Sequence, residues 1–343
     1  MLYFDSDYMA GGHPHVMDLL NETNMLHTTG YGTDEFTKRA EELIKNECGY
    51  PDGKVFFLTG GTQTNLVVID RLLSRNDGVI AAESAHINVH EAGAIEASGH
   101  KVISLPADNG KLSANAIRKY VKDFYDDETY PHMVRPAMVY LSFPTELGTI
   151  YTLKELEEIA EVCKEFDMYF YIDGARLAFG LAASAGDVTI KDLARLTDAF
   201  YIGGTKCGAL FGEAVMTRRP ELFNRFNSLI KLHGAMLAKG RLLGVQFEAL
   251  FADGLYYRIG KEAVRLAIKL KEGFTKKGYK LYIDSPTNQQ FFILPNEVIK
   301  NLRDNGISFE LWGPLLEKET PVRFVTGWAT TDKDIDKLLE VIS

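Results

Sequence analysis

Short runs of apolar residues alternate with amphipathic stretches between about residues 54 and 216. The first run, KVFFLTGG, is followed by TQTNLVVIDRLLS, whose apolar positions recur with the period of a helix. Further strands are expected over 78–84, 101–107, 136–143, 168–175, 198–204 and 213–218. Strands that are apolar throughout are typical of parallel sheets buried on both faces. The pattern therefore predicts an α/β region with a mostly parallel sheet between helices.

Helical patterns flank this region. The segment TDEFTKRAEELIKNE, at 33–47, places its apolar residues on one face, and Thr33 is expected to cap its N-terminus. A short helix is expected near residues 14–26, and the spacing between about 219 and 278 predicts a long helical region.

The C-terminal part predicts a smaller unit. QQFFILP and VRFVTGW are expected to form strands, and DKDIDKLLEVIS a closing helix. Because 343 residues exceed the usual size of one hydrophobic core, we expect more than one domain. We divide the chain into an N-terminal segment over 1–30, a large domain over 31–250 and a small α+β domain over 251–343.

The composition is that of an ordinary globular protein, with 46% hydrophobic and 25% charged residues. The net charge of −9 argues against a nucleic-acid partner, which requires a basic surface. No apolar run reaches the roughly 18–20 residues that span a bilayer, so no membrane partner is expected. The first residues lack the basic and apolar regions of a signal peptide, which predicts a soluble, cytoplasmic protein.

The three cysteines, Cys48, Cys163 and Cys207, are far apart and form no CxxC pair. Neither a zinc site nor a disulfide framework is therefore expected, which suits a reducing compartment. The acidic pair Asp126 and Asp127 could bind a cation, but a solvated loop is the favoured interpretation, and we expect no metal site.

A lysine follows a predicted strand in DAFYIGGTKCGALFGEA. A single lysine is most often a solvated surface residue. Here the glycines around Lys206 indicate that the backbone passes close to another group. A crowded, partly desolvated pocket lowers the pKa of an amine, as a Schiff-base lysine requires.

An aspartate ends another apolar strand in YFYIDGARL. Ligands of parallel sheets bind at the carboxyl ends of the strands, where Asp173 could hold a positive charge such as a protonated pyridine nitrogen. A turn-capping aspartate before glycine is an equal alternative. Arg176, three residues later, could pair with Asp173 or be exposed.

Two more strand ends carry candidate residues. Gly60, Gly61 and Thr62 stand between a strand and a helix, where backbone N–H groups can bind a phosphate, although a tight turn that binds nothing has the same pattern. The turn matches neither GxGxxG nor a Walker loop, which counts against nicotinamide dinucleotides and ATP. His86 and Glu91 follow the next strand, and His86 could stack on a flat ring, act as a base or be an ordinary histidine.

The order of these segments gives the stronger indication. A glycine-rich turn, a histidine, a strand-end aspartate and a lysine 33 residues later supply a phosphate cradle, a stacking partner, a counter-ion and an amine. These are the four groups that pyridoxal phosphate requires of a protein.

At this point the chain resembles the threonine aldolase / β-eliminating lyase family of fold-type I pyridoxal-phosphate enzymes. The resemblance runs from about residue 3 to residue 340. The matching blocks are YFDSD, GYGTDEFTKRAEELI, LTGGTQTNL, SAHINVHEAG, YIDGARL, GGTKCGALFGEA and PVRFVTGW. The resemblance implies an aspartate aminotransferase-like large domain, a small C-terminal α+β domain and an N-terminal segment, 1–30, that joins the active site.

The resemblance also implies how the cofactor is held. Lys206 would carry pyridoxal phosphate as a Schiff base, Asp173 would pair with the pyridine nitrogen, and His86 would stack on the ring. The residues implied to bind the phosphate are Gly61, Thr62 and Thr205.

The substrate side follows from the same resemblance. Ser6, Arg176 and Arg323 would bind the carboxylate of a small amino acid, since an arginine fork matches a carboxylate. Tyr31 would reach into the site of a neighbouring subunit, because members of this family form homodimers or homotetramers with shared active sites.

Two departures from the family pattern concern the details of the site. Many members have a histidine before the cofactor aspartate that contacts the substrate β-hydroxyl, whereas Thr145 and Glu146 stand there in SFPTELGTIYT. This resembles a subgroup that includes phenylserine-type aldolases. Members also often have an arginine that reaches a partner's phosphate, and Lys239 is the candidate replacement here, with Arg241 as the second choice.

The implied reaction is aldol cleavage of L-threonine, L-allo-threonine or a related β-hydroxy-α-amino acid to glycine and an aldehyde. His86, Glu91, Glu146 or a bound water could take the β-hydroxyl proton. The alternatives on the same fold are β-elimination, racemisation and transamination, and a non-catalytic protein that retains the fold is a further one.

Overall fold

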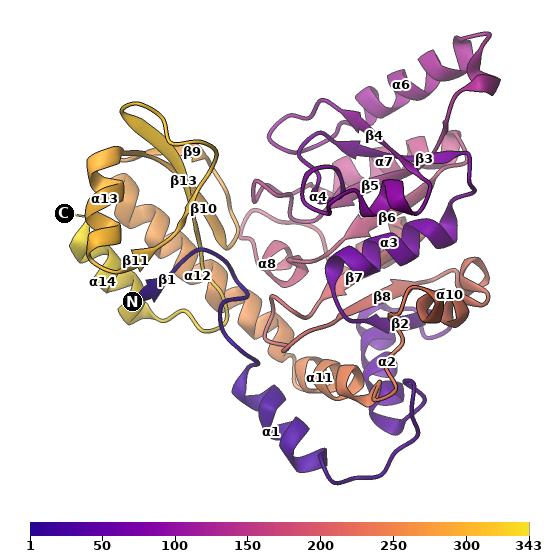
Figure 1. Ribbon diagram of the computed structural model, residues 1–343, viewed down its shortest axis with the longest axis horizontal. Helices are drawn as coiled ribbons and strands as arrows, with labels where there is room; N and C mark the ends of the chain where they lie inside the picture. The colour runs from indigo at the N-terminus through magenta and orange to yellow at the C-terminus, as the bar shows by residue number, and fades with distance from the viewer. Residues whose placement is uncertain (343) are drawn as a thin grey trace.

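The computed structural model describes residues 1–342 and contains two main sheets (Figure 1). The larger sheet has seven strands, which in spatial order are β2 (Lys54–Leu58), β8 (Glu213–Thr217), β7 (Ala199–Gly203), β6 (Tyr169–Asp173), β5 (Arg135–Ser142), β3 (Asp77–Ala82) and β4 (Lys101–Leu105). Neighbouring strands from β7 to β4 pair in parallel, and β8 pairs antiparallel with both β7 and the edge strand β2. The predicted α/β fold with a mostly parallel sheet is confirmed.

Helices cover this sheet and extend from it. They are α1 (Pro14–Thr23), α2 (Glu35–Cys48), α3 (Gly61–Leu72), α4 (His86–Val89), α5 (Ala94–Ala97), α6 (Ala114–Asp126), α7 (Leu153–Glu165), α8 (Leu177–Leu181), α9 (Ile190–Leu196), α10 (Phe226–Leu232), α11 (Arg241–Phe251) and α12 (Leu255–Lys276). Helix α2 packs against α11, and α11 also contacts α1.

Two details of the predicted helices are wrong. Asp34, not Thr33, caps α2, because its carboxylate accepts the Thr37 N–H at 2.9 Å while the Thr33 hydroxyl donates to the Gly30 carbonyl. The long helical region is divided into α10, α11 and α12. Gly234 and Gly254 adopt positive φ angles of 69° and 66° at the breaks, a conformation that ends a helix readily.

The smaller sheet is antiparallel and lies beside the C-terminal helices. Its strands, in spatial order, are β12 (Glu310–Leu311), β13 (Glu319–Val325), β10 (Gln289–Pro295) and β9 (Lys280–Ile283). The remaining helices are α13 (Asn296–Asp304) and α14 (Asp332–Val341). The N-terminal strand β1 (Leu2–Tyr3) pairs with β11 (Ile307–Ser308), so the two ends of the sequence meet in this part of the molecule.

Helix α12 links the two hydrophobic cores, as its course between the two sheets in Figure 1 suggests. Ile259 and Val264 pack into the core of the larger sheet, whereas Leu270 and Phe274 pack into that of the smaller one. The division into 1–30, 31–250 and 251–343 stays a prediction. No helix within residues 1–342 combines the length and the apolar character needed to cross a membrane.

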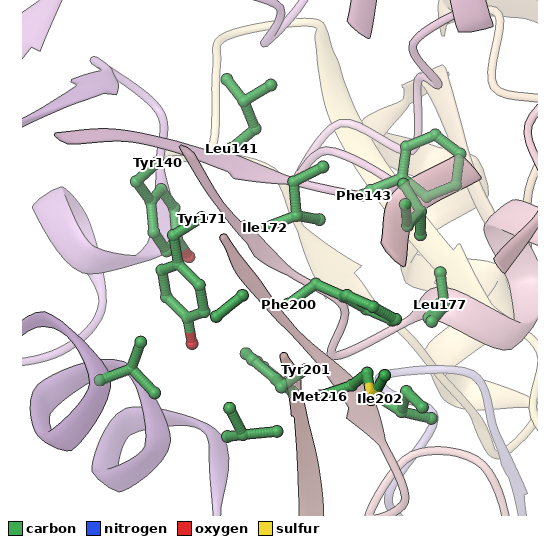
Figure 2. Close-up of a cluster of buried hydrophobic side chains, with 14 of the residues drawn as sticks. Tyr140, Leu141, Phe143, Tyr171, Ile172, Leu177, Phe200, Tyr201, Ile202 and Met216 are labelled. Atoms are coloured by element: carbon green, nitrogen blue, oxygen red, sulfur yellow. The ribbon is translucent and has the colours of Figure 1, made fainter. Parts of the chain in front are cut away.

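Buried tyrosines stand among the central strands. Figure 2 shows Tyr140 of β5 beside Tyr171 of β6, with ring centroids 5.9 Å apart, and Tyr201 on β7. All three are almost fully buried. Because a buried hydroxyl requires a hydrogen-bond partner, these side chains place polar atoms inside the core near the carboxyl ends of the strands.

The contact between α12 and α8 leads to a prediction. A Cβ atom on Gly260 would lie 2.3 Å from the Ala178 carbonyl oxygen, so Gly260→Ala would force the two helices apart. Overpacking of this kind costs about 1–3 kcal/mol, more than the roughly 1 kcal/mol that alanine gains in a helix. We expect urea denaturation to show a lower free energy of unfolding. Gly11→Ala is the control, since its Cβ meets nothing within 4 Å, and equal stability of the two variants would contradict this packing argument.

Candidate active site

A cavity of about 340 Å³ opens at the carboxyl ends of β5, β6 and β7. It gathers predicted site residues from segments far apart in the sequence. These are Gly61, Thr62, His86, Asp173, Arg176, Thr205 and Lys206. Ser6, Tyr31, Lys239 and Arg323 do not line it.

Lys206 lies in the loop after β7, and its amine has no hydrogen-bond or ion-pair partner among residues 1–342. Burial and the nearby Arg176 lower the pKa of Lys206, and the carboxylates of Asp7, Asp173 and Glu213 only partly oppose this. A buried amine with a lowered pKa is more often neutral and therefore nucleophilic.

Glu213, which the sequence analysis missed, stands beside this loop at the start of β8. Its carboxylate accepts the Gly204 N–H at 3.0 Å and the Thr205 hydroxyl at 2.8 Å. Burial raises the pKa of Glu213 to about 8 in spite of these donors and of Lys206. The sequence contained one indication of this role, because Glu213 is a charged residue at the start of the apolar strand β8. The same contact shows that the Thr205 hydroxyl already donates within the protein.

Asp173 ends β6 and is 5% exposed. Its Oδ2 accepts the Tyr140 hydroxyl at 2.6 Å and the Asn65 amide at 2.9 Å, and its Oδ1 accepts the Ala175 N–H at 2.9 Å. Burial opposes ionisation, but hydrogen bonds from Tyr140, Tyr201 and Asn65 outweigh it and lower the pKa of Asp173. The cavity therefore contains a buried negative charge, suited to a cationic ring nitrogen.

His86 begins the short helix α4 and has a fixed orientation. Its Nδ1 lies 2.7 Å from Oε1 of the buried Glu91, which also accepts the Asn65 amide at 2.7 Å. An ionised carboxylate can only accept, so Nδ1 carries the hydrogen and a neutral His86 has its free acceptor at Nε2. The sequence analysis identified His86 and Glu91 but missed Asn65, which is within the quoted block LTGGTQTNL.

The glycine-rich turn between β2 and α3 leaves backbone donors available. Gly60 is the N-cap residue of α3 and makes no side-chain capping bond, so N–H groups of the first turn are open to an anion. A Cβ atom on Gly61 would approach the Tyr201 hydroxyl to 3.1 Å, tighter than an ordinary contact. This turn can hold a phosphate close to the backbone.

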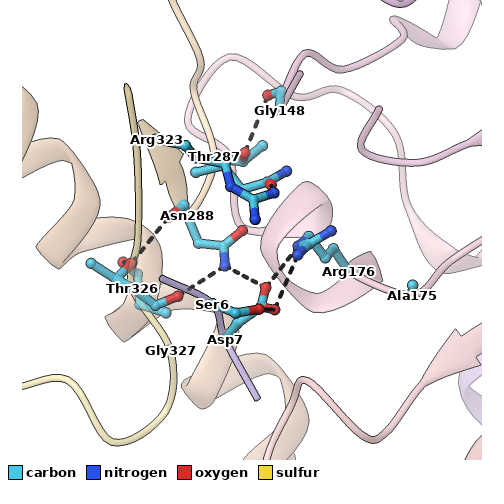
Figure 3. Close-up of polar contacts among 12 residues, drawn as sticks. Ser6, Asp7, Gly148, Ala175, Arg176, Thr287, Asn288, Arg323, Thr326 and Gly327 are labelled. Carbon is cyan, nitrogen blue, oxygen red and sulfur yellow. Dashed lines mark hydrogen bonds and ion pairs between the residues drawn. The ribbon is translucent and has the colours of Figure 1, made fainter. Parts of the chain in front are cut away.

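Arg176 is held by an aspartate that the sequence analysis missed. Its Nε and Nη2 donate to the two oxygens of Asp7 at 2.7 and 3.1 Å, as Figure 3 shows. Asn288 also donates to Asp7, at 2.9 Å. Burial opposes ionisation of Asp7, but Arg176, Lys206 and Asn288 outweigh it and lower the pKa of this carboxyl. The N-terminal segment, the larger sheet and the smaller domain thus meet at one ion pair.

Arg323 of β13 lies near Arg176 in Figure 3 but has other partners. It donates to Gln289 Oε1 at 2.9 Å, pairs with the half-exposed Glu310 and stacks over Trp312. Burial and the charge on Arg176 lower the pKa of Arg323. Ser6, also drawn in Figure 3, contacts Asp7 at 3.4 Å and lines a neighbouring cavity.

The other two predicted residues lie elsewhere on the chain. Tyr31 is 53% exposed, has a positive φ of 59° and lies under the Lys231 amine in a separate surface pocket. Lys239 is exposed in the loop before α11. Arg241, its alternative, donates to the carbonyls of Leu26 and Thr23 and so anchors the segment after α1.

Thr145 and Glu146 line the cavity, in the stretch that departs from the family pattern. The Thr145 hydroxyl lies 2.6 Å from that of Thr149. Glu146 accepts the His86 N–H at 2.9 Å and the Ser142 hydroxyl at 2.6 Å, and burial raises its pKa. Glu146 therefore holds the start of α4, where His86 lies.

Known proteins resemble the whole chain. The sequence model of the family described as beta-eliminating lyase matches residues 4–293. A low-specificity L-threonine aldolase of Pseudomonas aeruginosa is 30% identical, and the match covers 98% of this chain and 95% of that protein. The solved structure of a Leishmania major threonine aldolase is 42% identical with a TM-score of 0.96, covering 100% and 98% of the two chains.

A more distant structure has the same fold. A double mutant of aspartate aminotransferase from Thermus thermophilus is 15% identical, with a TM-score of 0.72 and coverage of 99% and 90% of the two chains. The predicted aspartate aminotransferase-like architecture is thereby confirmed.

The Asp7–Arg176 pair leads to a prediction about stability. Asp7→Asn would leave a buried guanidinium without its anion, which costs about 3–5 kcal/mol. Folding lowers the pKa of Asp7. The contribution of Asp7 to the free energy of unfolding is therefore full above about pH 4 and declines as the pH falls further. We expect urea denaturation to show that the free energy of unfolding of Asp7→Asn is well below that of the parent protein at pH 7, and that this difference becomes smaller below pH 4.

Asp123→Asn is the matched control, since Asp123 forms an exposed pair with Lys119. It should change the free energy of unfolding by less than about 0.5 kcal/mol. A deficit in Asp7→Asn that is small, or constant with pH, would contradict the role given to this pair.

Proposed function

The chain belongs to the β-eliminating lyase family, and from this membership we propose that it is a pyridoxal-phosphate enzyme that cleaves L-threonine, L-allo-threonine or a related β-hydroxy-α-amino acid to glycine and an aldehyde. The family match confirms the resemblance found in the sequence. The observation that carries the proposal is the unpaired, partly buried Lys206 amine in the same cavity as the buried Asp173 carboxylate.

The residues of the cavity fit pyridoxal phosphate. Lys206 would hold the aldehyde carbon, Asp173 would hold the pyridine nitrogen, and His86 would lie against the ring. The phosphate would be bound by the open N–H groups at Gly61 and Thr62 in the first turn of α3 and by the Thr62 hydroxyl. Thr205 lines the same cavity, and its hydroxyl would have to leave Glu213 to donate to the phosphate. When bound, the cofactor supplies an electron sink for the electron pair that bond cleavage leaves at Cα.

The substrate carboxylate would be bound by arginines. Arg176 lines the cavity, and Arg323 lies close enough for the charge on Arg176 to affect its pKa. The two arginines differ in their carboxylate partners. Asp7, which pairs with Arg176, is fully buried, whereas Glu310, which pairs with Arg323, is 46% exposed and can move aside for the substrate. Ser6, next to Asp7, would complete this site.

Two proton transfers accompany cleavage of the Cα–Cβ bond. A base takes the proton of the β-hydroxyl as the aldehyde leaves, and a proton is then added at Cα to give glycine. His86 would take the first proton, since Glu91 holds its Nδ1 and leaves Nε2 as the acceptor. Glu146 would support His86, because its Oε1 accepts both the His86 N–H and the Ser142 hydroxyl.

The chain would work in the cytoplasm as a homodimer or homotetramer with shared active sites. Tyr31, exposed and outside the cavity of its own chain, would reach into the site of a neighbouring subunit. Lys239, also exposed, would contact the phosphate bound there.

The first experiment tests cofactor and reaction together. Purified protein supplied with pyridoxal phosphate is expected to show the visible absorbance band of a lysine-bound cofactor, and to release glycine and aldehyde from at least one of L-threonine, L-allo-threonine and L-phenylserine. Lys206→Ala should lose both the band and the glycine, because it lacks the amine that holds the cofactor.

Lys119→Ala removes an exposed lysine on α6 and should retain both. A band without glycine would refute aldol cleavage, and release of ammonia and a keto acid would favour β-elimination. No band in the parent protein would refute the cofactor itself.

A second experiment concerns the base. His86→Phe keeps a flat ring but removes Nε2, so kcat should fall by about 100-fold or more while the cofactor band remains. Glu146→Gln should keep most of its activity. A larger loss of kcat in Glu146→Gln than in His86→Phe would identify Glu146 as the base instead.

A further inference from the structure

Asn65 is fully buried in α3, between two carboxylates that come from different parts of the chain. Its Nδ2 donates to Glu91 Oε1 at 2.7 Å and to Asp173 Oδ2 at 2.9 Å. Its Oδ1 accepts the Tyr171 hydroxyl at 3.0 Å. The orientation of the amide is therefore fixed, since ionised carboxylates only accept and only the nitrogen of the amide donates.

These bonds form a continuous path across the back of the cavity. From His86 Nδ1 the path passes to Glu91, then through Asn65 to Asp173. His86 and Asp173, at its two ends, line the cavity, whereas Asn65 and Glu91 do not. The two groups that would face the cofactor are thus joined through two residues that do not touch it.

An amide suits this place better than the other kinds of side chain. An apolar residue would leave the two buried carboxylates without a shared donor, and like charges in a low-dielectric interior repel. A lysine or arginine would pair with Asp173 and neutralise the charge meant for the ring nitrogen. The asparagine donates to both anions and brings no charge of its own.

We propose that Asn65 is a positioning residue that fixes Asp173 and His86 relative to each other through Glu91. This inference rests on the proposed function, because it takes Asp173 and His86 as the groups that hold the ring. It adds a role for a residue that contacts neither cofactor nor substrate.

The test is Asn65→Leu, which keeps the approximate size of the side chain and removes all its hydrogen bonds. We expect the circular dichroism of the cofactor band, per bound cofactor, to fall or shift, because the ring loses its fixed surroundings. We also expect kcat to fall about tenfold or more, the scale known for outer-shell partners, while KM for L-threonine changes less than threefold.

Gln290→Leu is the matched control, since it removes a fully buried amide that donates to the carbonyls of Ser285 and Thr287. It should lower stability without changing the dichroism of the cofactor band. An unchanged band and a kcat within threefold of the parent in Asn65→Leu would overturn the proposal, as would an equal change in Gln290→Leu.

If Asn65→Leu does not fold, Tyr171→Phe tests the same point. It removes the hydroxyl that donates to Asn65 Oδ1, one of the three hydrogen bonds that hold the amide in place, so a smaller change in the dichroism is expected and an unchanged band would overturn the proposal. The dichroism also separates this inference from the proposed function. If the parent binds the cofactor but releases no glycine, aldol cleavage fails while the role of Asn65 is still measured.

Discussion

The site depends on keeping the carboxylate of Asp173 ionised inside the protein. Burial raises the pKa of Asp173 and so favours its protonated form, and donors from several directions outweigh this effect. Tyr140 comes from β5, Tyr201 from β7, Asn65 from α3 and the Ala175 N–H from the turn after β6. These donors converge only when neighbouring parallel strands end at the same level and α3 covers them. The fold of the larger sheet is therefore a condition for the charge in the cavity.

The Asp7–Arg176 pair joins the other parts of the molecule to this cavity. Asp7 follows a strand that pairs with β11, Arg176 precedes α8, and Asn288 leads into β10. A bidentate pair with little exposure tolerates small displacements poorly, so it sets the position of the N-terminal segment and the smaller sheet relative to the larger sheet. The arginine that would bind substrate is thus oriented by residues from both ends of the chain.

Sequence patterns predicted the parts of this structure that depend on local periodicity. The strands, most helices and the residues at strand ends follow from apolar runs and their boundaries, which explains why His86, Asp173 and Lys206 could be identified. Tyr140 and Tyr201 could not, because a tyrosine in an apolar strand looks like core and its hydroxyl finds a partner only through tertiary contacts. The same holds for Asn65 and for the pairing of Arg323 with Glu310, which joins strands separated in sequence. The capping error at Thr33 has a local cause, since two adjacent residues were both suitable caps.

Burial acts on Lys206 and Asp173 with the same physical effect but different results. For each group it disfavours the charged form. Asp173 receives several hydrogen bonds that stabilise its charge, so its pKa is lowered and it remains an anion. Lys206 receives no such bond among residues 1–342, and the nearby Arg176 adds repulsion, so its pKa is lowered and its neutral form is favoured. One cavity can thus contain a stable anion and a nucleophilic amine together, because Asp173 accepts several hydrogen bonds and Lys206 forms none within the described part of the chain.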